Sequence, residues 1–210
     1  MTTIALFGAT GRTGRHVLDQ ALTAGHQVRA LARRPEVLEP RAGLTVIGGD
    51  VTDPAAVGSV IEGADAVVSV FGHVKGSPPT VQTAGTRVIV EAMRLEGIMR
   101  IISLSGGGLR YPEKDRPKPA DHIIRLLLTL IAPAVLSDAT AHLQVLRDSG
   151  LDWTVVRGPR LTDGPRTDSY RVGWVGVDAS TSISRADLAA SILAQLDDLT
   201  YRHQLPFVSN

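Results

Sequence analysis

The chain has 210 residues, 43% hydrophobic and 20% charged, and its 22 basic and 21 acidic residues leave a formal net charge of +1. This length and composition are typical of one globular domain that buries its own core. The balanced charge gives no indication of a nucleic-acid partner. The absence of cysteine excludes disulfides, thiolate catalysis and cysteine metal ligands, and no histidine–carboxylate spacing predicts a metal site.

The chain shows no signal for export or membrane insertion. The N-terminal segment MTTIALFGAT lacks the basic region that precedes the apolar part of a signal peptide. The longest apolar run, residues 123–136, contains Arg125 and is shorter than the roughly 20 residues of a membrane span. We therefore expect a soluble, cytoplasmic protein without a membrane partner.

Short apolar segments alternate with helix-length amphipathic segments along the whole chain. The apolar segments are continuous, as expected for strands covered on both faces. They predict strands at residues 3–7, 28–32, 44–47, 66–70, 100–104 and 153–156. Helices are expected from about Gly14 to Gly25 and over residues 54–62, 80–96, 120–132, 137–148 and 186–197. The pattern predicts an α/β fold with a doubly wound parallel sheet and helices on both faces.

A glycine-rich turn, GATGRTG at residues 8–14, follows the first predicted strand and opens the first predicted helix. Gly8 permits a tight turn, Gly11 lets backbone N–H groups approach a pyrophosphate, and Gly14 lets the helix pack closely. This placement is typical of a dinucleotide-binding βαβ unit. We expect the turn to hold the cofactor through Gly8, Thr10, Gly11, Arg12, Thr13 and Gly14.

The end of the second predicted strand indicates which dinucleotide is bound. It reads ALARRPE, with Arg33 and Arg34 where an NAD site usually places a carboxylate. These guanidinium groups, with Arg12 in the glycine turn, favour a 2′-phosphate. The sequence therefore predicts NADP(H) rather than NAD(H), with Arg33 as the main contact.

Other predicted strands end in residues suited to the rest of the cofactor. Those after the third strand are expected beside the adenine, those after the fourth near a ribose, and those after the fifth near the nicotinamide. In chain order these residues are Asp50, Val51, Val70, Phe71, Gly72, Ser103, Ser105 and Gly106.

The motifs together resemble the atypical short-chain dehydrogenase/reductases of the NmrA-like, NAD(P)H-binding family. The resembling segments are residues 8–14, 49–51, 83–93, 149–163 and 175–193, so the likeness covers essentially one domain, residues 1–210. It implies a single Rossmann-type domain with a small C-terminal substrate-side region, residues 105–136 and 158–184 shaping the substrate pocket. The family serine after the fifth strand corresponds to Ser105.

Within that family the chain is similar to biliverdin IXβ reductase/flavin reductase. The resemblance implies that an element after the sixth strand borders the pocket, here Arg157, Pro159, Arg160 and Leu161, and Pro159 is also expected to bind the cofactor. The biliverdin/flavin reductase carries a histidine where this chain has Arg160, a departure that counts against tetrapyrrole chemistry.

The Tyr-x-x-x-Lys pair of ordinary short-chain enzymes is absent. Four residues after Tyr111, Tyr170 and Tyr201 stand Asp115, Trp174 and Leu205. A chain without this pair can still support hydride transfer from NADPH to a flavin, quinone or other conjugated planar acceptor, because the cofactor performs the difficult step of that reaction. The catalytic candidates are Ser105, Arg160 and Tyr170, with His73, His142 and Asp138 as further acid–base groups.

Two other functions stay open. One is a non-catalytic NADP(H) sensor of the NmrA-like type that acts through a protein partner. The other is an epimerase- or dehydratase-like enzyme on a nucleotide-linked substrate, which the missing Tyr-x-x-x-Lys pair disfavours.

Two segments have open structural roles. Residues 110–122 are rich in proline and charge, and form either a flap over the site or a solvated loop. The apolar residues 123–136 are expected to pack in the core, with dimerisation or a lid over an apolar acceptor as alternatives. A monomer and a homodimer are both compatible with the sequence.

Overall fold

The computed structural model describes all 210 residues and is built on one eight-stranded sheet. The order is β3-β2-β1-β4-β5-β6-β10-β8, and neighbouring strands are parallel except for the antiparallel β10–β8 pair. The strands are β1 (Thr3–Phe7), β2 (Gln27–Ala32), β3 (Leu44–Gly48), β4 (Ala66–Ser69), β5 (Arg100–Gly106), β6 (Asp152–Gly158), β8 (Arg171–Gly173) and β10 (Phe207–Ser209). The strand order reverses between β1 and β4, where α/β sheets of this topology bind ligands. The predicted doubly wound parallel sheet is confirmed.

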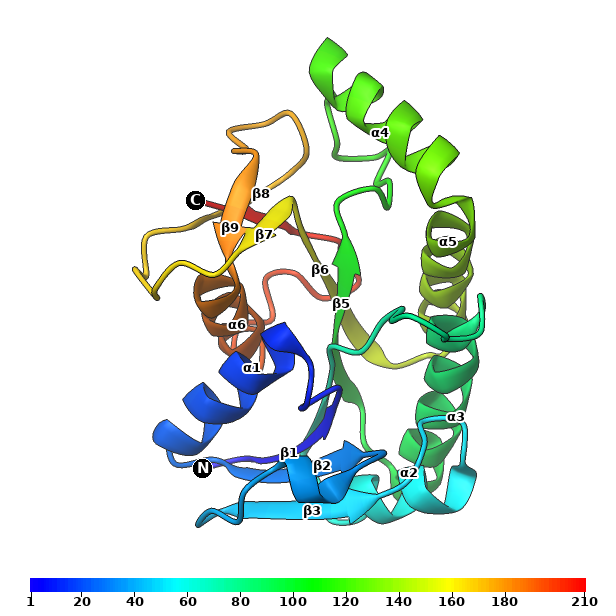
Figure 1. Cartoon of the computed structure of the whole chain (residues 1–210), viewed down its shortest axis with the longest axis vertical. Helices are drawn as coiled ribbons and strands as arrows, with labels where there is room; N and C mark the ends of the chain where they lie inside the picture. The colour runs from blue at the N-terminus through cyan, green and yellow to red at the C-terminus, as the bar shows by residue number, and fades with distance from the viewer.

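Helices cover both faces of the sheet (Figure 1). One face carries α1 (Arg12–Thr23) and α6 (Arg185–Ala194), and the other carries α2 (Pro54–Ile61), α3 (Val81–Glu96) and α5 (Pro133–Arg147). The core has two halves, because successive strand side chains point to opposite faces. Phe7 of β1 joins the α2–α3–α5 half, whereas its neighbour Leu6 joins the α1–α6 half.

Short elements complete the chain. The 3-10 helix η1 (Pro35–Val37) follows β2, and β7 (Arg160–Thr162) pairs with β9 (Ser182–Ser184) as a separate parallel ribbon. None of these elements, nor β8 and β10, was expected from the sequence.

Helix α4 (Pro119–Ile131) corrects the expectation that the apolar segment packs in the core. None of its residues is buried, and Leu126 and Leu130 are 61% and 71% exposed. In Figure 1 α4 projects from the end of the molecule, while α5 lies beside α3. The chain bends by 104° at the break between α4 and α5, so only α5 reaches the sheet.

No single helix is long and apolar enough to cross a membrane, and the bent α4–α5 pair meets that test only by its length and composition.

The proline-rich segment 110–122 is anchored rather than free. The guanidinium of Arg157, on β6, is fully buried and donates to both carboxylate oxygens of Asp115 at 2.8 Å. The same guanidinium donates to the carbonyls of Leu109 and Leu205, and Asp115 also accepts from the Tyr111 N–H. Arg157 therefore anchors this segment to the sheet, and it lines neither of the two cavities described below, whereas the resemblance implied that it borders the substrate pocket.

The buried carboxylate of Asp187 ties the C-terminal region together. It accepts hydrogen bonds from Thr167, Asp168, Ser184 and Asn210. Burial disfavours its charged form, but the hydrogen bonds outweigh this effect and lower the pKa of Asp187 to about 2.

This low pKa predicts a loss of stability in acid. An unfolded Asp titrates near ~3.9, so the folded state gains on the order of 2 kcal/mol above that pH and loses it as the pH falls toward 2. We expect Asp187→Asn to be less stable than the wild type at neutral pH and to lack this part of the stability loss in acid. Urea unfolding across that pH window measures it. The variant Asp197→Asn, at an exposed position, should lose stability in acid as the wild type does. The same pH dependence of unfolding in both variants would contradict the prediction.

Candidate functional site

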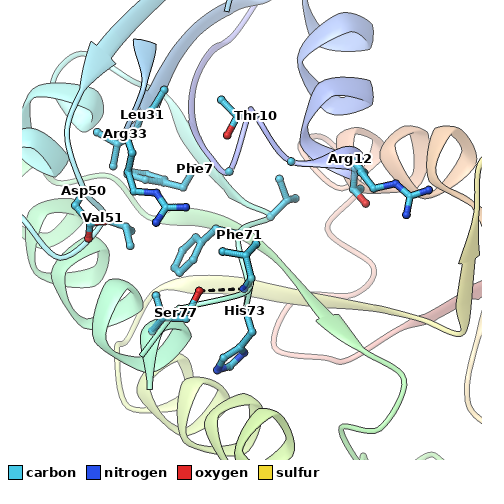
Figure 2. Close-up of a pocket in the computed structure, with 18 of the residues that line it drawn as sticks. Phe7, Thr10, Arg12, Leu31, Arg33, Asp50, Val51, Phe71, His73 and Ser77 are labelled. Carbon is cyan, nitrogen blue, oxygen red and sulfur yellow. Dashed lines mark hydrogen bonds between the residues drawn. The ribbon is translucent and has the colours of Figure 1, made fainter. Parts of the chain in front are cut away.

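A cavity of about 410 Å³ lies at the carboxyl ends of β1, β2 and β4 (Figure 2). Eleven residues predicted to bind the cofactor line it: Gly8, Thr10, Gly11, Arg12, Thr13, Arg33, Asp50, Val51, Val70, Phe71 and Gly72. The glycine turn, the end of β2 and the segments after β3 and β4 therefore meet at one edge of the sheet, where parallel α/β sheets bind nucleotides.

The glycine turn has the geometry of a phosphate cradle. Gly8 has a φ of 94°, a region that favours glycine. A Cβ on Gly14 would lie 1.9 Å from the carbonyl oxygen of Gly8, so the turn closes only around a glycine. No side chain caps α1 at Gly11, and its first turn carries no acidic residue. The first N–H groups of α1 and its positive end are therefore suited to a pyrophosphate.

The three predicted arginines take different positions. Arg33 extends into the cavity toward Phe71 in Figure 2. Arg12 also lines the cavity, but its guanidinium forms an ion pair with Asp163 and points away from Arg33. Arg34 does not line the cavity. One of the three therefore offers its guanidinium directly to a ligand in this cavity.

Asp50 remains a carboxylate beside Arg33. Hydrogen bonds from the Thr52 hydroxyl and backbone N–H lower the pKa of Asp50, and the Arg33 guanidinium adds to the effect. The cavity wall thus presents a fixed acceptor next to a cation, which suits a purine ribose and a phosphate.

A second cavity, of about 690 Å³, lies at the carboxyl ends of β5 and β6. Its walls come from the segment after β5, from α4 and the start of α5, and from the segment after β6. The apolar side chains of the wall include Leu128 of α4, Leu136 of α5 and Phe207 of β10. The volume lies in the range of small-molecule sites, about 300–1,000 Å³.

Pro159 and Arg160 line this second cavity rather than the first, and the expected contact of Pro159 with the cofactor stays a prediction. Leu161, the next residue, lines the first cavity. The two cavities therefore lie on either side of residues 160–161.

Neither predicted serine lines a cavity. The Ser103 hydroxyl is buried and lies 3.1 Å from Nε2 of His142. The Ser105 hydroxyl is buried without a hydrogen-bond partner, one residue before Gly106, which lines the second cavity. An unpaired buried hydroxyl is costly, and this makes Ser105 a group that a ligand or a small side-chain movement would satisfy.

Tyr170 lies outside both cavities and packs against the α1–α6 half of the core. Burial raises the pKa of its hydroxyl, with nearby carboxylates adding to the effect. Tyr170 does not line either of the two cavities, and its catalytic role stays a prediction.

The remaining acid–base candidates form a buried network beneath the site. Asp138 accepts from the N–H groups of Gln82 and Thr83 at 2.9 Å and so caps α3; its carboxylate lies 3.2 Å from His73. Burial lowers the pKa of His142 to about 4, and its ring contacts Thr86 and Ser103. His142 and Asp138 are therefore structural, whereas His73 also lines the first cavity.

Several lining residues were not expected from the sequence. They come from the loop after β4, from the start of α3 and from the start of α6: Val74, Ser77, Val81 and Arg185. The Arg185 guanidinium pairs with Asp163, the same carboxylate that pairs with Arg12. No motif marks these positions, because they reach the site only through the fold.

Similarity to known proteins shows the family to which this chain belongs. Residues 8–199 match a family model described as NAD(P)H-binding. The chain is 31% identical over 185 residues to (4-alkanoyl-5-oxo-2,5-dihydrofuran-3-yl)methyl phosphate reductase of Streptomyces griseus, with 87% of this chain and 54% of that protein covered. The chain thus spans about half the length of that reductase.

Solved structures share the fold over the whole chain. A short-chain dehydrogenase/reductase of Veillonella parvula in complex with NADP has a TM-score of 0.80 at 19% identity, with 100% of this chain and 94% of that chain covered. ChuY, an anaerobillin reductase from Escherichia coli, has a TM-score of 0.77 at 21% identity, covering 99% and 97%. At these identities the likeness shows the fold alone.

Proposed function

The chain belongs to the NAD(P)H-binding family, and from this premise we propose that it is an NADPH-dependent reductase that passes hydride to a flavin, quinone or similar conjugated planar acceptor. The observation that carries the proposal is the pair of cavities on either side of residues 160–161. The first has the residues for a dinucleotide, and the second has the volume and apolar walls for a planar molecule.

The first cavity suits NADPH better than NADH. Its glycine turn and the uncapped α1 would hold the pyrophosphate. Arg33 would hold the 2′-phosphate, since its guanidinium extends into the cavity and no acidic residue replaces it at the end of β2.

Two neighbouring arginines provide a matched test of this preference. We expect Arg33→Gln to weaken NADPH binding by about 10-fold or more, the cost of a charge-assisted hydrogen bond, and to leave NADH binding nearly unchanged. Arg34→Gln removes the same charge one residue away, outside the cavity. It should change NADPH binding little. Titration of each variant with NADPH and NADH measures the preference, and equal losses in the two variants would contradict the role of Arg33.

The second cavity would hold the acceptor. Bound NADPH would supply a hydride, and a proton from solvent would complete the two-electron reduction of the acceptor to its dihydro form. Arg160 stands between the cavities and is exposed, so its guanidinium would stabilise negative charge that develops on the acceptor when hydride arrives. The chain lacks a Tyr-x-x-x-Lys pair, in keeping with an acceptor that delocalises this charge.

Other findings support a reductase. The Streptomyces relative and ChuY are both named as reductases, and the Veillonella structure contains NADP. A flavin, a quinone and a tetrapyrrole therefore form a reasonable first panel of acceptors.

The experiment is to follow nicotinamide absorption when FMN, 1,4-naphthoquinone or biliverdin is added to the protein with NADPH. Oxidation of NADPH that saturates with one acceptor supports the proposal and gives its substrate class. Tight NADPH binding without turnover of any acceptor would overturn it and favour the non-catalytic sensor.

A further inference from the structure

The second cavity has an unbalanced charge. Its charged side chains, apart from His122, are Arg110, Asp115, Asp121, Arg125 and Arg160. Both carboxylates are already engaged within the fold. Asp115 is paired with the buried Arg157, and Asp121 accepts from the Lys118 N–H at 2.7 Å at the start of α4. Three guanidinium groups therefore remain without a carboxylate partner in a mostly apolar cavity.

Arg110 and Arg125 are close enough to influence each other. Burial lowers the pKa of Arg125, and the positive charge of Arg110 lowers it further. Neither residue takes part in an ion pair. The Arg125 guanidinium donates to the carbonyl of Gly108 and is thereby held at the cavity wall. Arg110 and Arg125 thus bring two cations without a carboxylate partner to one cavity, an arrangement that suits an acidic group.

The apolar part of the wall lies beside this cationic pair. Ile124 and Leu128 come from α4, next to Arg125, and Leu136 and Phe207 complete the apolar surface. The cavity therefore accommodates a molecule with one apolar body and one anionic end. Because Arg160 stands at the junction with the first cavity, the end of the molecule that reacts would lie there and the anionic end would lie toward α4.

We propose that the acceptor is an anion, and that Arg110 and Arg125 bind its carboxylate or phosphate group while its planar body lies against the apolar wall. This inference rests on the proposed function, since it assigns a ligand class to the acceptor cavity. The two arginines are specificity residues, and they take no part in hydride transfer.

Two pairs of compounds test the inference, because the members of each pair share a ring system and differ in their acidic groups. FMN and riboflavin differ by a phosphate, and biliverdin and its dimethyl ester differ by two carboxylates. Binding is measured by fluorescence or absorbance titration with NADP⁺ present, so that no hydride is transferred. The proteins are the wild type, Arg110→Gln, Arg125→Gln, and Arg87→Gln, which removes the same charge from an exposed site on α3.

We expect the anionic member of at least one pair to bind wild type about 10-fold more tightly than its neutral partner, as charge-assisted hydrogen bonds predict. Arg110→Gln should reduce this ratio to about 3-fold or less and leave the neutral compound unchanged, because one of two guanidinium contacts is lost. Arg87→Gln should keep the ratio. Arg110 makes no hydrogen bond within the fold, so its variant separates ligand binding from folding better than Arg125→Gln does. The pair with the larger ratio distinguishes a phosphate from a carboxylate ligand.

Equal binding of both members of both pairs would overturn the inference, as would an undiminished ratio in Arg110→Gln or no binding of any of the four compounds. Its failure is distinguishable from failure of the proposed function. NADPH oxidation without any preference for anions would refute the inference alone. A preference for anions without oxidation of NADPH by any acceptor would refute the reductase and leave an anion-binding cavity.

Discussion

Replacing Gly14 with alanine is expected to weaken NADPH binding on the order of 100-fold, the equivalent of about 3 kcal/mol of lost hydrogen bonds to the charged pyrophosphate. The added Cβ would lie 1.9 Å from the carbonyl oxygen of Gly8 and 2.7 Å from its carbon. These are backbone atoms, so the glycine turn must move away from α1. The N–H groups that would hold the pyrophosphate then lose their arrangement. Calorimetric titration with NADPH measures the effect.

Gly58 provides the control for this substitution. It lies within α2, and a Cβ there would meet no atom within 4 Å. Gly58→Ala should therefore keep NADPH affinity and stabilise the fold by about 0.5–1 kcal/mol through its helix propensity. Wild-type affinity in Gly14→Ala would show that the turn is not the phosphate site.

Removal of the Asp115 carboxylate is expected to cost about 3–5 kcal/mol of the free energy of unfolding. This cost arises because the substitution leaves the charge of Arg157 buried without its carboxylate partner. Arg157 is fully buried, and without Asp115 its charge is compensated by backbone carbonyls alone. Asp115→Ala should also loosen the segment after β5 that forms one wall of the second cavity. Urea denaturation gives the change in stability.

An exposed ion pair and a double variant serve as controls. Asp19→Ala breaks a pair with Arg41 in which both side chains are largely exposed, and should cost at most about 1 kcal/mol. Replacing both buried partners, as Arg157→Met with Asp115→Leu, should recover much of the lost stability, because no uncompensated charge remains. If Asp115→Ala lost no more unfolding free energy than Asp19→Ala, the stabilising role of the Asp115–Arg157 pair would be contradicted.

The central part of the fold could be predicted because the inner strands of the sheet, such as β1, β4 and β5, are largely buried. The continuous apolar run in β4 and β5 is the direct result of that burial. The three-residue strands β7, β8, β9 and β10 are too short to show a period, so they could not be predicted. Helix α4 misled the prediction, because an apolar helix without a buried residue has the same sequence pattern as a core helix.

The first cavity could be predicted because its residues follow strands and a glycine motif whose order is fixed by the topology. The sequence favoured Arg33 as the main contact, and Arg33 lines the cavity whereas Arg34 does not. The second cavity could not be predicted from the sequence, because ion pairs between residues far apart in the chain decide which of its charged side chains have a partner. Asp115 is neutralised by Arg157, 42 residues away, while Arg110 has no such partner.

The central claim is that hydride passes from a dinucleotide in the first cavity to an acceptor in the second. Its most direct test is a single-turnover stopped-flow experiment with NADPH deuterated on either face of nicotinamide C4, mixed with the acceptor that turns over best. We expect NADPH loss and acceptor reduction to proceed at one rate, and deuterium on one face alone to slow both and to enter the product. NADPH that binds and remains reduced, or acceptor reduction without an isotope effect on either face and without deuterium in the product, would contradict it.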